Sequence, residues 1–493
     1  MRLHHLILLF LVCTIGVARA DPERPPDVVL KGSISGADNQ TYRSLPFEVP
    51  SGIGRITIAF SYTGREQHTT IDIGLFDNER FRGWSGGNKA RFTLSETDAT
   101  PSYLPGPIGA GTWQLQLGIP NIRKDAHSDY EADIWFDKID AAPAVSAFSD
   151  APLKTGPAWY RCDLHMHTAQ SDGECVSQSG AKVPCPLYKT VEAAAARGLD
   201  FIAISDHNAT SQFNEERELQ PTFDRLLLLP GREITTFYGH ANVFGTTGFI
   251  DFRLGSEQMP DFNAMLTRIA ALGGVVSINH PSSPSGEICM GCGWSAPNTD
   301  YSRVQAIEVM NGGLTAALGG LVESPISGIP FWEALLNKGF RLTAIGGSDN
   351  HDGPSSKAPI VGVPVTGVYA DDLSDRAILN AIRKGRAFVD TTGATTSLLE
   401  LNSRRAMMGD TIRVRAHERV PFTVHVAGVL GNVISIVEDG QKITPLDDAT
   451  IGFADERKTF VLTLDGMRHW LRADVRDAKG RLLLIGNPIF VNY

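Results

Sequence analysis

Histidine and acidic residues recur in this sequence where short apolar segments end. The first two, His165 and His167, are separated by one residue, so both imidazoles project from the same side of an extended chain and can reach one metal ion. Similar groups follow later apolar segments, in SDHN, PGRE, NHP and GGSDNH. The candidate metal ligands are His165, His167, Asp172, His207, Glu233, His240, His280, Asp349 and His351.

This set of donors is too large for a single ion. One ion accepts about four to six donors, so six imidazoles and three carboxylates predict a cluster of two or three divalent transition-metal ions. Mixed nitrogen and oxygen donors favour zinc, manganese or iron over magnesium and calcium, which prefer oxygen alone. Such a cluster lowers the pKa of bound water and supplies a metal-bound hydroxide. We therefore predict a metal-dependent hydrolase.

Four of the candidate ligands have further expected roles. Glu233 is expected to bridge two ions, and Asp349 is the candidate that relays the proton of the nucleophile, although it can also serve as a ligand alone. His207 and His280 are candidates for protonating the leaving group, a role that metal ligation of the imidazole opposes.

Cations and aromatic residues near the motifs bear on the substrate. Arg232 and Lys357 are candidates for binding a phosphate group, with surface solvation or a structural ion pair as the alternative for each. Trp294, in MGCGWS, could instead form an apolar wall for an aromatic leaving group. These residues do not decide between a phosphoester and a carbamate substrate.

Alternating strands and helices must position these groups. From about residue 159 to 393, short apolar segments alternate with helical segments, which is typical of a parallel α/β layer. Because the active sites of βα barrels form at the carboxyl ends of the strands, we expect the ligands to meet at one rim. The predicted strands are 160–164, 200–204, 226–229, 275–278, 304–310 and 341–345, and the predicted helices include 190–198, 260–274, 331–339 and 374–385.

Two segments with a period of two flank this region. Apolar and polar residues alternate between about 28 and 140, which predicts an antiparallel β-sandwich of roughly seven strands, and again after about 397, which predicts a second small sandwich. We expect an N-terminal sandwich with its linker at 21–155, a metallohydrolase barrel at 156–395 and a C-terminal sandwich at 396–493. The fold class is therefore a multidomain α/β protein with flanking β modules.

The N-terminal residues and the charge indicate where the protein works. Residues 1–20 combine Arg2, an apolar run and the small-residue pattern Ala18-Arg19-Ala20, which predicts a secretory signal peptide and a periplasmic or secreted protein without a stable membrane anchor. A net charge of −10, from 45 basic and 55 acidic residues, argues against a nucleic-acid partner. The expected partner is a small-molecule ester substrate.

Five cysteines lie beyond the predicted signal peptide. The preferred pairing joins Cys175 to Cys185 and Cys289 to Cys292 and leaves Cys162 buried in a strand, while crossed pairings stay open.

The motifs DLHMHTAQSDG, ISDHN, PGRE with GHANVFG, INHP and GSDNH resemble those of the PHP (polymerase and histidinol phosphatase) superfamily of metallohydrolases. The resemblance covers residues 159 to 393 and implies a distorted seven-stranded βα barrel. The nine candidate ligands occupy the superfamily's nine ligand positions. A complete set implies retained catalysis, because PHP domains that have become structural typically lose ligands.

The segments GSDNHDG, GVPVTGVYADD, AIRKGRAFV and NPIFV are similar to the carbaryl-hydrolase-like (CehA/McbA) branch, which includes aryl carbamate ester hydrolases. The superfamily implies a phosphoesterase, and the branch implies a carbamate or carboxylic ester hydrolase. A non-catalytic binding protein is a further alternative. A peptidase is disfavoured because the sequence has neither a Gly-x-Ser-x-Gly nor a His-Glu-x-x-His motif.

Overall fold

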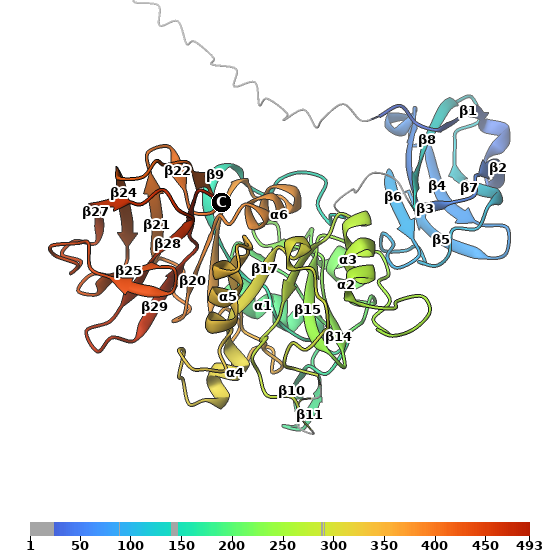
Figure 1. The fold of residues 1–493 in the computed structure, drawn as a ribbon. Helices are drawn as coiled ribbons and strands as arrows, with labels where there is room; N and C mark the ends of the chain where they lie inside the picture. Colours follow the sequence, from blue (N-terminus) through green and yellow to red (C-terminus); the bar gives the residue numbers. More distant parts are fainter. Residues whose placement is uncertain (1–23, 88, 140–145, 287–288, 290) are drawn as a thin grey trace, which may run out of the picture.

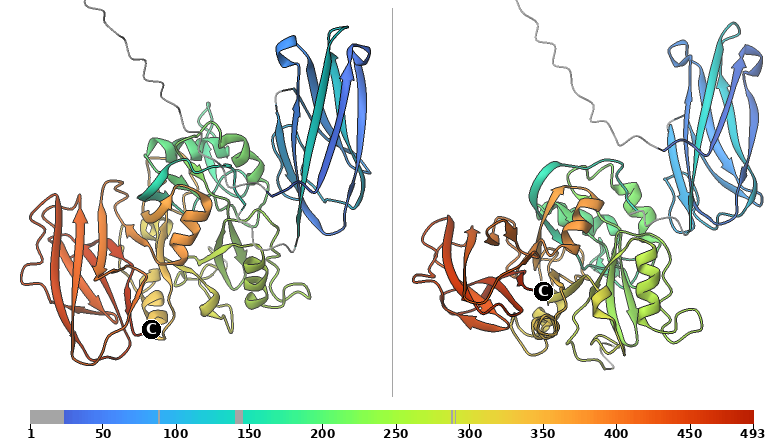
Figure 2. Two further views of the ribbon diagram at one scale, coloured as in Figure 1. Left: turned by 90° about the horizontal axis from the view of Figure 1, so that it is seen from above. Right: turned by 45° about the horizontal axis from the view of Figure 1, so that its top comes forward.

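The computed structural model describes residues 24–87, 89–139, 146–286, 289 and 291–493 (Figure 1). The predicted signal peptide and residues 140–145 of the predicted linker lie outside the described residues. Within the described part, no helix has the length and apolar character needed to cross a bilayer. The chain forms a mixed α/β structure with many strands and few helices, arranged as a central α/β region between two β-rich regions (Figures 1 and 2).

The N-terminal region is a β-sandwich of eight strands, one more than predicted. Two antiparallel sheets with the orders β1-β8-β3-β6 and β2-β7-β4-β5 enclose an apolar core that includes Ile58, Trp113 and Leu115. The elements are β1 (Val28–Ser35), η1 (Gly36–Asp38), β2 (Thr41–Val49), β3 (Ile53–Tyr62), η2 (Arg65–Gln67), β4 (Thr70–Phe76), β5 (Phe81–Gly86), β6 (Arg91–Ser95), β7 (Gly111–Asn121) and β8 (His127–Lys138).

The central region alternates strands and helices. Two of its helices begin at side-chain caps: the Asp261 side chain accepts from the Ala264 N–H at the start of α3, and the Ser374 side chain accepts from the Ala377 N–H at the start of α6. The elements are β9 (Thr155–Asp163), β10 (Glu174–Val176), β11 (Lys182–Pro184), α1 (Leu187–Ala196), β12 (Phe201–Ile202), α2 (Gln212–Leu219), β13 (Leu227–Leu228), β14 (Gly231–Thr236), β15 (Gly239–Phe244), α3 (Phe262–Ala271), β16 (Val275–Ile278), η3 (Tyr301–Arg303), β17 (Ala306–Asn311), α4 (Gly312–Ala317), α5 (Gly328–Asn337), β18 (Thr343–Gly347), β19 (Val365–Asp372), α6 (Asp375–Arg383) and β20 (Ala387–Asp390).

Apart from the β10–β11 hairpin, these strands lie in two sheets. One contains the order β13-β12-β9-β19-β20, and the other has the order β14-β15-β16-β17-β18. Isolated parallel bridges between Met166 and Asn350 and between His207 and Glu233 connect the two sheets at the strand ends that carry the candidate ligands. The pattern differs from seven successive βα units, because β14 and β15 form a hairpin with no helix between them and β15 also runs antiparallel to β16.

The C-terminal β region continues the central sheet. Strand β20 pairs with β29, which pairs with β28, so one sheet extends from the central region into the C-terminal region, and a second sheet of order β22-β21-β24-β27 packs beside it. The strands are β21 (Leu398–Ser403), β22 (Ala406–Met407), β23 (Thr411–Ile412), β24 (Glu418–Ala427), β25 (Val433–Glu438), β26 (Gln441–Ile443), β27 (Asp455–Leu464), β28 (His469–Arg476), β29 (Leu482–Gly486) and β30 (Ile489–Val491).

The N-terminal sandwich contacts the central region through a buried carboxylate. Asp98, which follows β6, accepts hydrogen bonds from Arg55 of the sandwich, from Arg217 of α2 and from the Thr247 hydroxyl. Thr97 also donates its hydroxyl proton to the Thr247 carbonyl at 2.8 Å. Polar groups from both regions therefore satisfy the Asp98 charge.

The disulfides follow the preferred pairing. Cys175 is bonded to Cys185 and Cys289 to Cys292, while Cys162 is a buried free thiol on β9. The first disulfide joins β10 to the residue that follows β11, and the second closes a turn in the loop after β16.

Candidate metal centre

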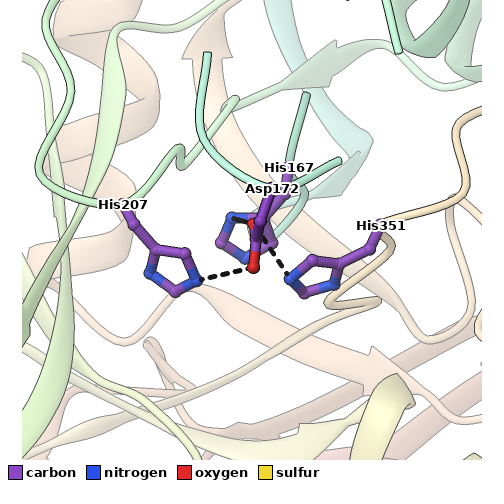
Figure 3. A group of neighbouring side chains, drawn as sticks. All are labelled: His167, Asp172, His207 and His351. Atoms are coloured by element: carbon purple, nitrogen blue, oxygen red, sulfur yellow. Dashed lines mark ion pairs between the residues drawn. The ribbon is translucent and has the colours of Figure 1, made fainter. Parts of the chain in front are cut away.

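All nine candidate ligands lie in one centre, where the two sheets of the central region meet. His165, His167 and Asp172 follow β9, His207 follows β12, Glu233 and His240 lie on the β14–β15 hairpin, His280 follows β16, and Asp349 and His351 follow β18. Figure 3 shows Asp172 among the imidazoles of His167, His207 and His351.

The donor atoms divide into four overlapping groups, and within each group the atoms lie within 4.8 Å of one another. Each group could hold a metal ion. His165, His167, His207 and Glu233 each belong to two groups, so neighbouring positions share ligands, as expected for a cluster. The groups are His167, Asp172, His207 and His351; His165, His167 and Asp349; His165, Glu233 and His280; and His207, Glu233 and His240.

Several pairs of donor atoms have a spacing that suits shared metal ligation, although His207 Nδ1 lies at hydrogen-bond distance from Glu233 Oε2, 2.8 Å away. Glu233 Oε1 lies 3.4 Å from His165 Nε2, 3.4 Å from His240 Nδ1 and 3.6 Å from His280 Nε2. His165 Nε2 also lies 3.3 Å from Asp349 Oδ1. Ligands about 2.0–2.1 Å from a tetrahedral ion are ~3.3 Å apart, so an ion fits between these atoms.

Several buried nitrogens of the centre have no hydrogen-bond partner among the described residues. They are Nε2 of His165, Nδ1 of His167 and both ring nitrogens of His240. A buried polar atom without a partner costs about 1–3 kcal/mol, so a protein rarely keeps several together unless something else binds them. The donor set therefore fits bound divalent ions.

Electrostatics hold the carboxylates of the centre ionised. Burial alone would raise the pKa of Glu233, but the imidazoles of His165 and His207 beside it hold that pKa well below its usual value. Burial would also raise the pKa of Asp349, but the imidazoles of His165 and His167 hold that pKa well below its usual value. Desolvation lowers the pKa of His167 to about 4, so this imidazole is neutral near pH 7 and able to bind a metal.

Two ligand residues have a strained backbone. His280 has φ 27° and Asp349 has φ 53°, in the left-handed region that residues other than glycine rarely adopt. Such strain persists where the surrounding contacts fix the chain, and it is common at functional sites. Both residues lie directly after a strand, and this backbone conformation turns the chain there so that their side chains belong to the centre.

Arg232 does not reach the centre, which corrects its assignment as a substrate-binding residue. Neighbouring residues of a strand point to opposite faces, so Glu233 faces the ligands and Arg232 faces away from them. The guanidinium of Arg232 is buried, donates to the Gly248 carbonyl at 2.8 Å and lies over the ring of Phe213. Burial lowers its pKa to about 10.

The other two residues considered for the substrate lie in different surroundings. Lys357 is exposed in the loop after the last motif, and its binding role stays a prediction. Trp294 packs edge-on against Phe262 of α3 at a centroid distance of 4.6 Å, and a side chain on Gly239 would collide with its ring. The Trp294 ring therefore supports the β14–β15 hairpin from the side of α3.

Sequence reasoning missed the buried polar residues that hold the ligands. Glu308 on β17 contacts His165, and Asn279 donates to Glu233 Oε1 at 2.7 Å. Asp206 accepts from the backbone N–H and hydroxyl of Thr168 and from the Ser171 hydroxyl, which fixes the loop between His167 and Asp172. The available signal was an acidic or amide side chain inside an apolar strand or beside a ligand, as in AIEVM, SDHN and INHP.

No protein-family model matches the chain, and no curated protein matches it significantly. Among solved structures, a two-domain protein from Bacteroides vulgatus, described as containing a predicted PHP-like metal-dependent phosphoesterase, is 20% identical over 71% of this chain and 100% of its own, with a TM-score of 0.36. A protein from Bifidobacterium adolescentis, provisionally described as a metal-dependent phosphoesterase, is 18% identical over 45% of this chain and 96% of its own, with a TM-score of 0.28. Both neighbours are thus described as metal-dependent phosphoesterases.

Proposed function

We propose that this protein is an exported metal-dependent hydrolase of the PHP type that cleaves an ester bond. The observation that carries the proposal is the convergence of nine imidazole and carboxylate side chains from five segments, with buried nitrogens that have no hydrogen-bond partner among the described residues. A structural polar cluster would satisfy these nitrogens. The sequence motifs that resemble those of PHP metallohydrolases contain the same nine residues.

Bound divalent ions would supply Lewis acidity and lower the pKa of coordinated water towards neutrality. The residues of the chain would organise that chemistry. Glu233, whose Oε1 approaches three imidazoles, is the proposed bridging ligand. Asp349 Oδ2 accepts from the side-chain amide of Asn311 at 3.1 Å, so its carboxylate is held in place while it relays a proton.

The solvent side of the centre is the proposed entry for the substrate. The Asp172 side chain is 56% exposed and that of His351 is 37% exposed, whereas His165, His167 and Glu233 are buried. His207, which is partly exposed and has Nδ1 2.8 Å from Glu233 Oε2, is better placed than the buried His280 to protonate a leaving group. This role remains in competition with metal ligation.

A phosphoester is the first substrate candidate, on the superfamily resemblance, and an aryl carbamate is the second. The second is favoured by two aromatic side chains at the turn of the β14–β15 hairpin, between Thr235 and His240. Phe237 is 90% exposed and Tyr238 is 43% exposed. Among the described residues, no lysine or arginine forms an ion pair with the nine ligands, so a phosphate would be neutralised mainly by the ions, with Lys357 as the candidate side chain.

The test combines metal analysis with a substrate panel. Protein purified from the periplasm is measured for transition metals by mass spectrometry and assayed with p-nitrophenyl phosphate, a phosphodiester and a naphthyl methylcarbamate. We expect at least two equivalents of metal and hydrolysis within the panel, both lost in His165→Ala/His167→Ala. Less than two equivalents would overturn the cluster, and hydrolysis that persists in the double variant would overturn the assignment of the centre. Recovery of uncleaved protein from the cytoplasm would overturn export.

A further inference from the structure

Glu308 is a buried carboxylate that touches the centre from behind and belongs to none of its four donor groups. It lies on β17 with 2% of its surface exposed. Its Oε1 atom is 2.8 Å from Nδ1 of His165, on the side of the ring opposite to the nitrogen that faces Asp349 and Glu233. Its Oε2 atom accepts the backbone N–H of His280 at 2.9 Å. One side chain therefore holds two ligand residues.

Asn311 extends these contacts to a third ligand. Its side-chain Nδ2 donates to Glu308 Oε2 and to Asp349 Oδ2, both at 3.1 Å. Its Oδ1 accepts the backbone N–H of Leu314 at 2.7 Å and caps α4, so its amide orientation is fixed by the helix. Glu308 and Asn311 thus connect His165, His280 and Asp349 in one hydrogen-bonded network.

This network reaches only part of the centre. The groups His165–Glu233–His280 and His165–His167–Asp349 contain the residues that it holds. The group of His167, Asp172, His207 and His351 contains none of them. We name the first two groups the inner positions and the third the outer position. The remaining group, His207, Glu233 and His240, also contains no residue that the network holds and is counted with neither.

We propose that Glu308 is a positioning residue that orients His165 and His280 and thereby sets the metal affinity of the inner positions while leaving the outer position independent. This inference rests on the proposed function. An acceptor at Nδ1 keeps the proton of a neutral imidazole on that nitrogen, so Nε2 presents its lone pair to an ion. Outer-shell partners of this kind typically change metal affinity by about 10–100-fold.

The variants are Glu308→Ala and Glu308→Gln. Alanine removes all three contacts. Glutamine can still accept from His165 Nδ1–H, but its NH₂ group would face the His280 N–H and the Asn311 amide, which are also donors. The matched control is Glu216→Gln on α2, a fully buried glutamate outside the centre whose carboxylate oxygens have no hydrogen-bond partner among the described residues.

Metal equivalents per chain and their affinities are measured by mass spectrometry after equilibration with a chelator series, and circular dichroism checks folding. In Glu308→Ala we expect the inner equivalents to bind about 10–100-fold more weakly while one outer equivalent keeps the affinity found in the unaltered protein. The metal affinity of Glu308→Gln should lie between those of Glu308→Ala and the unaltered protein. The metal affinities of Glu216→Gln should match those of the unaltered protein. Anomalous diffraction from crystals of Glu308→Gln identifies which position loses its ion.

Each other outcome decides a separate point. Fewer than two equivalents in the unaltered protein would overturn the proposed function itself. Two or more equivalents there, with unchanged affinities in Glu308→Ala, would overturn the inference alone. Equal weakening of inner and outer equivalents would overturn the independence of the outer position. If Glu308→Ala does not fold, unchanged affinities in Glu308→Gln overturn the inference.

Discussion

The backbone carbonyl oxygen of Cys292 lies 3.0 Å from Nδ1 of His280, so a loop closed by a disulfide is hydrogen-bonded to a candidate metal ligand. The carbonyl can only accept, so Nδ1 of the neutral ring carries the proton and Nε2, on the side of Glu233, is free to bind an ion. The Cys289–Cys292 disulfide closes the loop that carries this carbonyl, so it helps to select the tautomer of His280.

Removal of that disulfide should weaken metal binding at His280. In Cys289→Ser/Cys292→Ser the carbonyl remains but the loop is less constrained, so we expect a loss of roughly tenfold in the affinity of one equivalent, at the low end for an outer-shell partner. Chelator competition measures this loss. His280→Ala removes the ligand itself and therefore gives the largest loss of affinity to be expected for the same equivalent. An affinity that the double substitution leaves unchanged would refute the role of the loop.

Substitution of Glu233 should affect more than one ion. Glu233 belongs to two of the donor groups, so Glu233→Gln, which loses the charge but keeps the shape, is expected to lower hydrolysis by more than about 100-fold and to release more than one metal equivalent. Metal analysis and steady-state kinetics test this expectation. His351→Ala, which removes a ligand of the outer position alone, is the comparison, and a loss of one equivalent in both variants would show that Glu233 does not bridge.

Substitution of Asp98 should destabilise the contact between the N-terminal sandwich and α2. The side chain is completely buried, and Asp98→Ala would leave Arg217 without its carboxylate partner in a site that is only 12% exposed. Breaking a buried ion pair costs about 3–5 kcal/mol, which we expect as a lower free energy of unfolding in urea titrations. Lys31→Ala, which breaks an exposed ion pair with Glu131 in the same sandwich, should change stability by less than about 1 kcal/mol. Equal losses in free energy of unfolding for both substitutions would show that the Asp98 ion pairs do not stabilise this contact.

Asp375 should make the protein less stable as the pH rises. Burial raises the pKa of this carboxyl at the start of α6 from 3.8 to about 7. Between pH 4 and 7 the unfolded chain loses this proton and the folded chain keeps it, so the carboxyl opposes folding increasingly up to pH 7, by about 4 kcal/mol at most. Above pH 7 the destabilisation by Asp375 stays constant.

Asp375→Asn removes this titration. The difference in free energy of unfolding between the variant and the unaltered protein should therefore shift in favour of the variant from pH 4 to 7 and then level off. Urea titrations in the presence of a chelator measure the difference without a contribution from bound metal. A difference that is independent of pH would show that the carboxyl titrates normally.

Much of the centre was predictable because its ligands are local features of the sequence. Except for Asp172, which lies further along the loop after β9, each of the nine side chains lies in or shortly after a short apolar segment, and such segments form strands whose ends meet. The preferred disulfide pairing is also confirmed, and in each case it joins the cysteines that are nearer in sequence, whereas the sequence alone left crossed pairings open.

The sequence by itself therefore determined which side chains supply imidazoles and carboxylates, and it determined the alternation that builds their strands. Tertiary structure decided which faces of those strands meet. It turned Arg232 into the core while Glu233 faces the ligands, and it placed Glu308 behind His165, 143 positions away in the chain. It also joined the C-terminal strands to the central sheet through β20 and β29. Strand alternation puts Arg232 and Glu233 on opposite faces, but which face meets the ligands, and which distant strands pair, depend on register and packing that no local pattern of residues encodes.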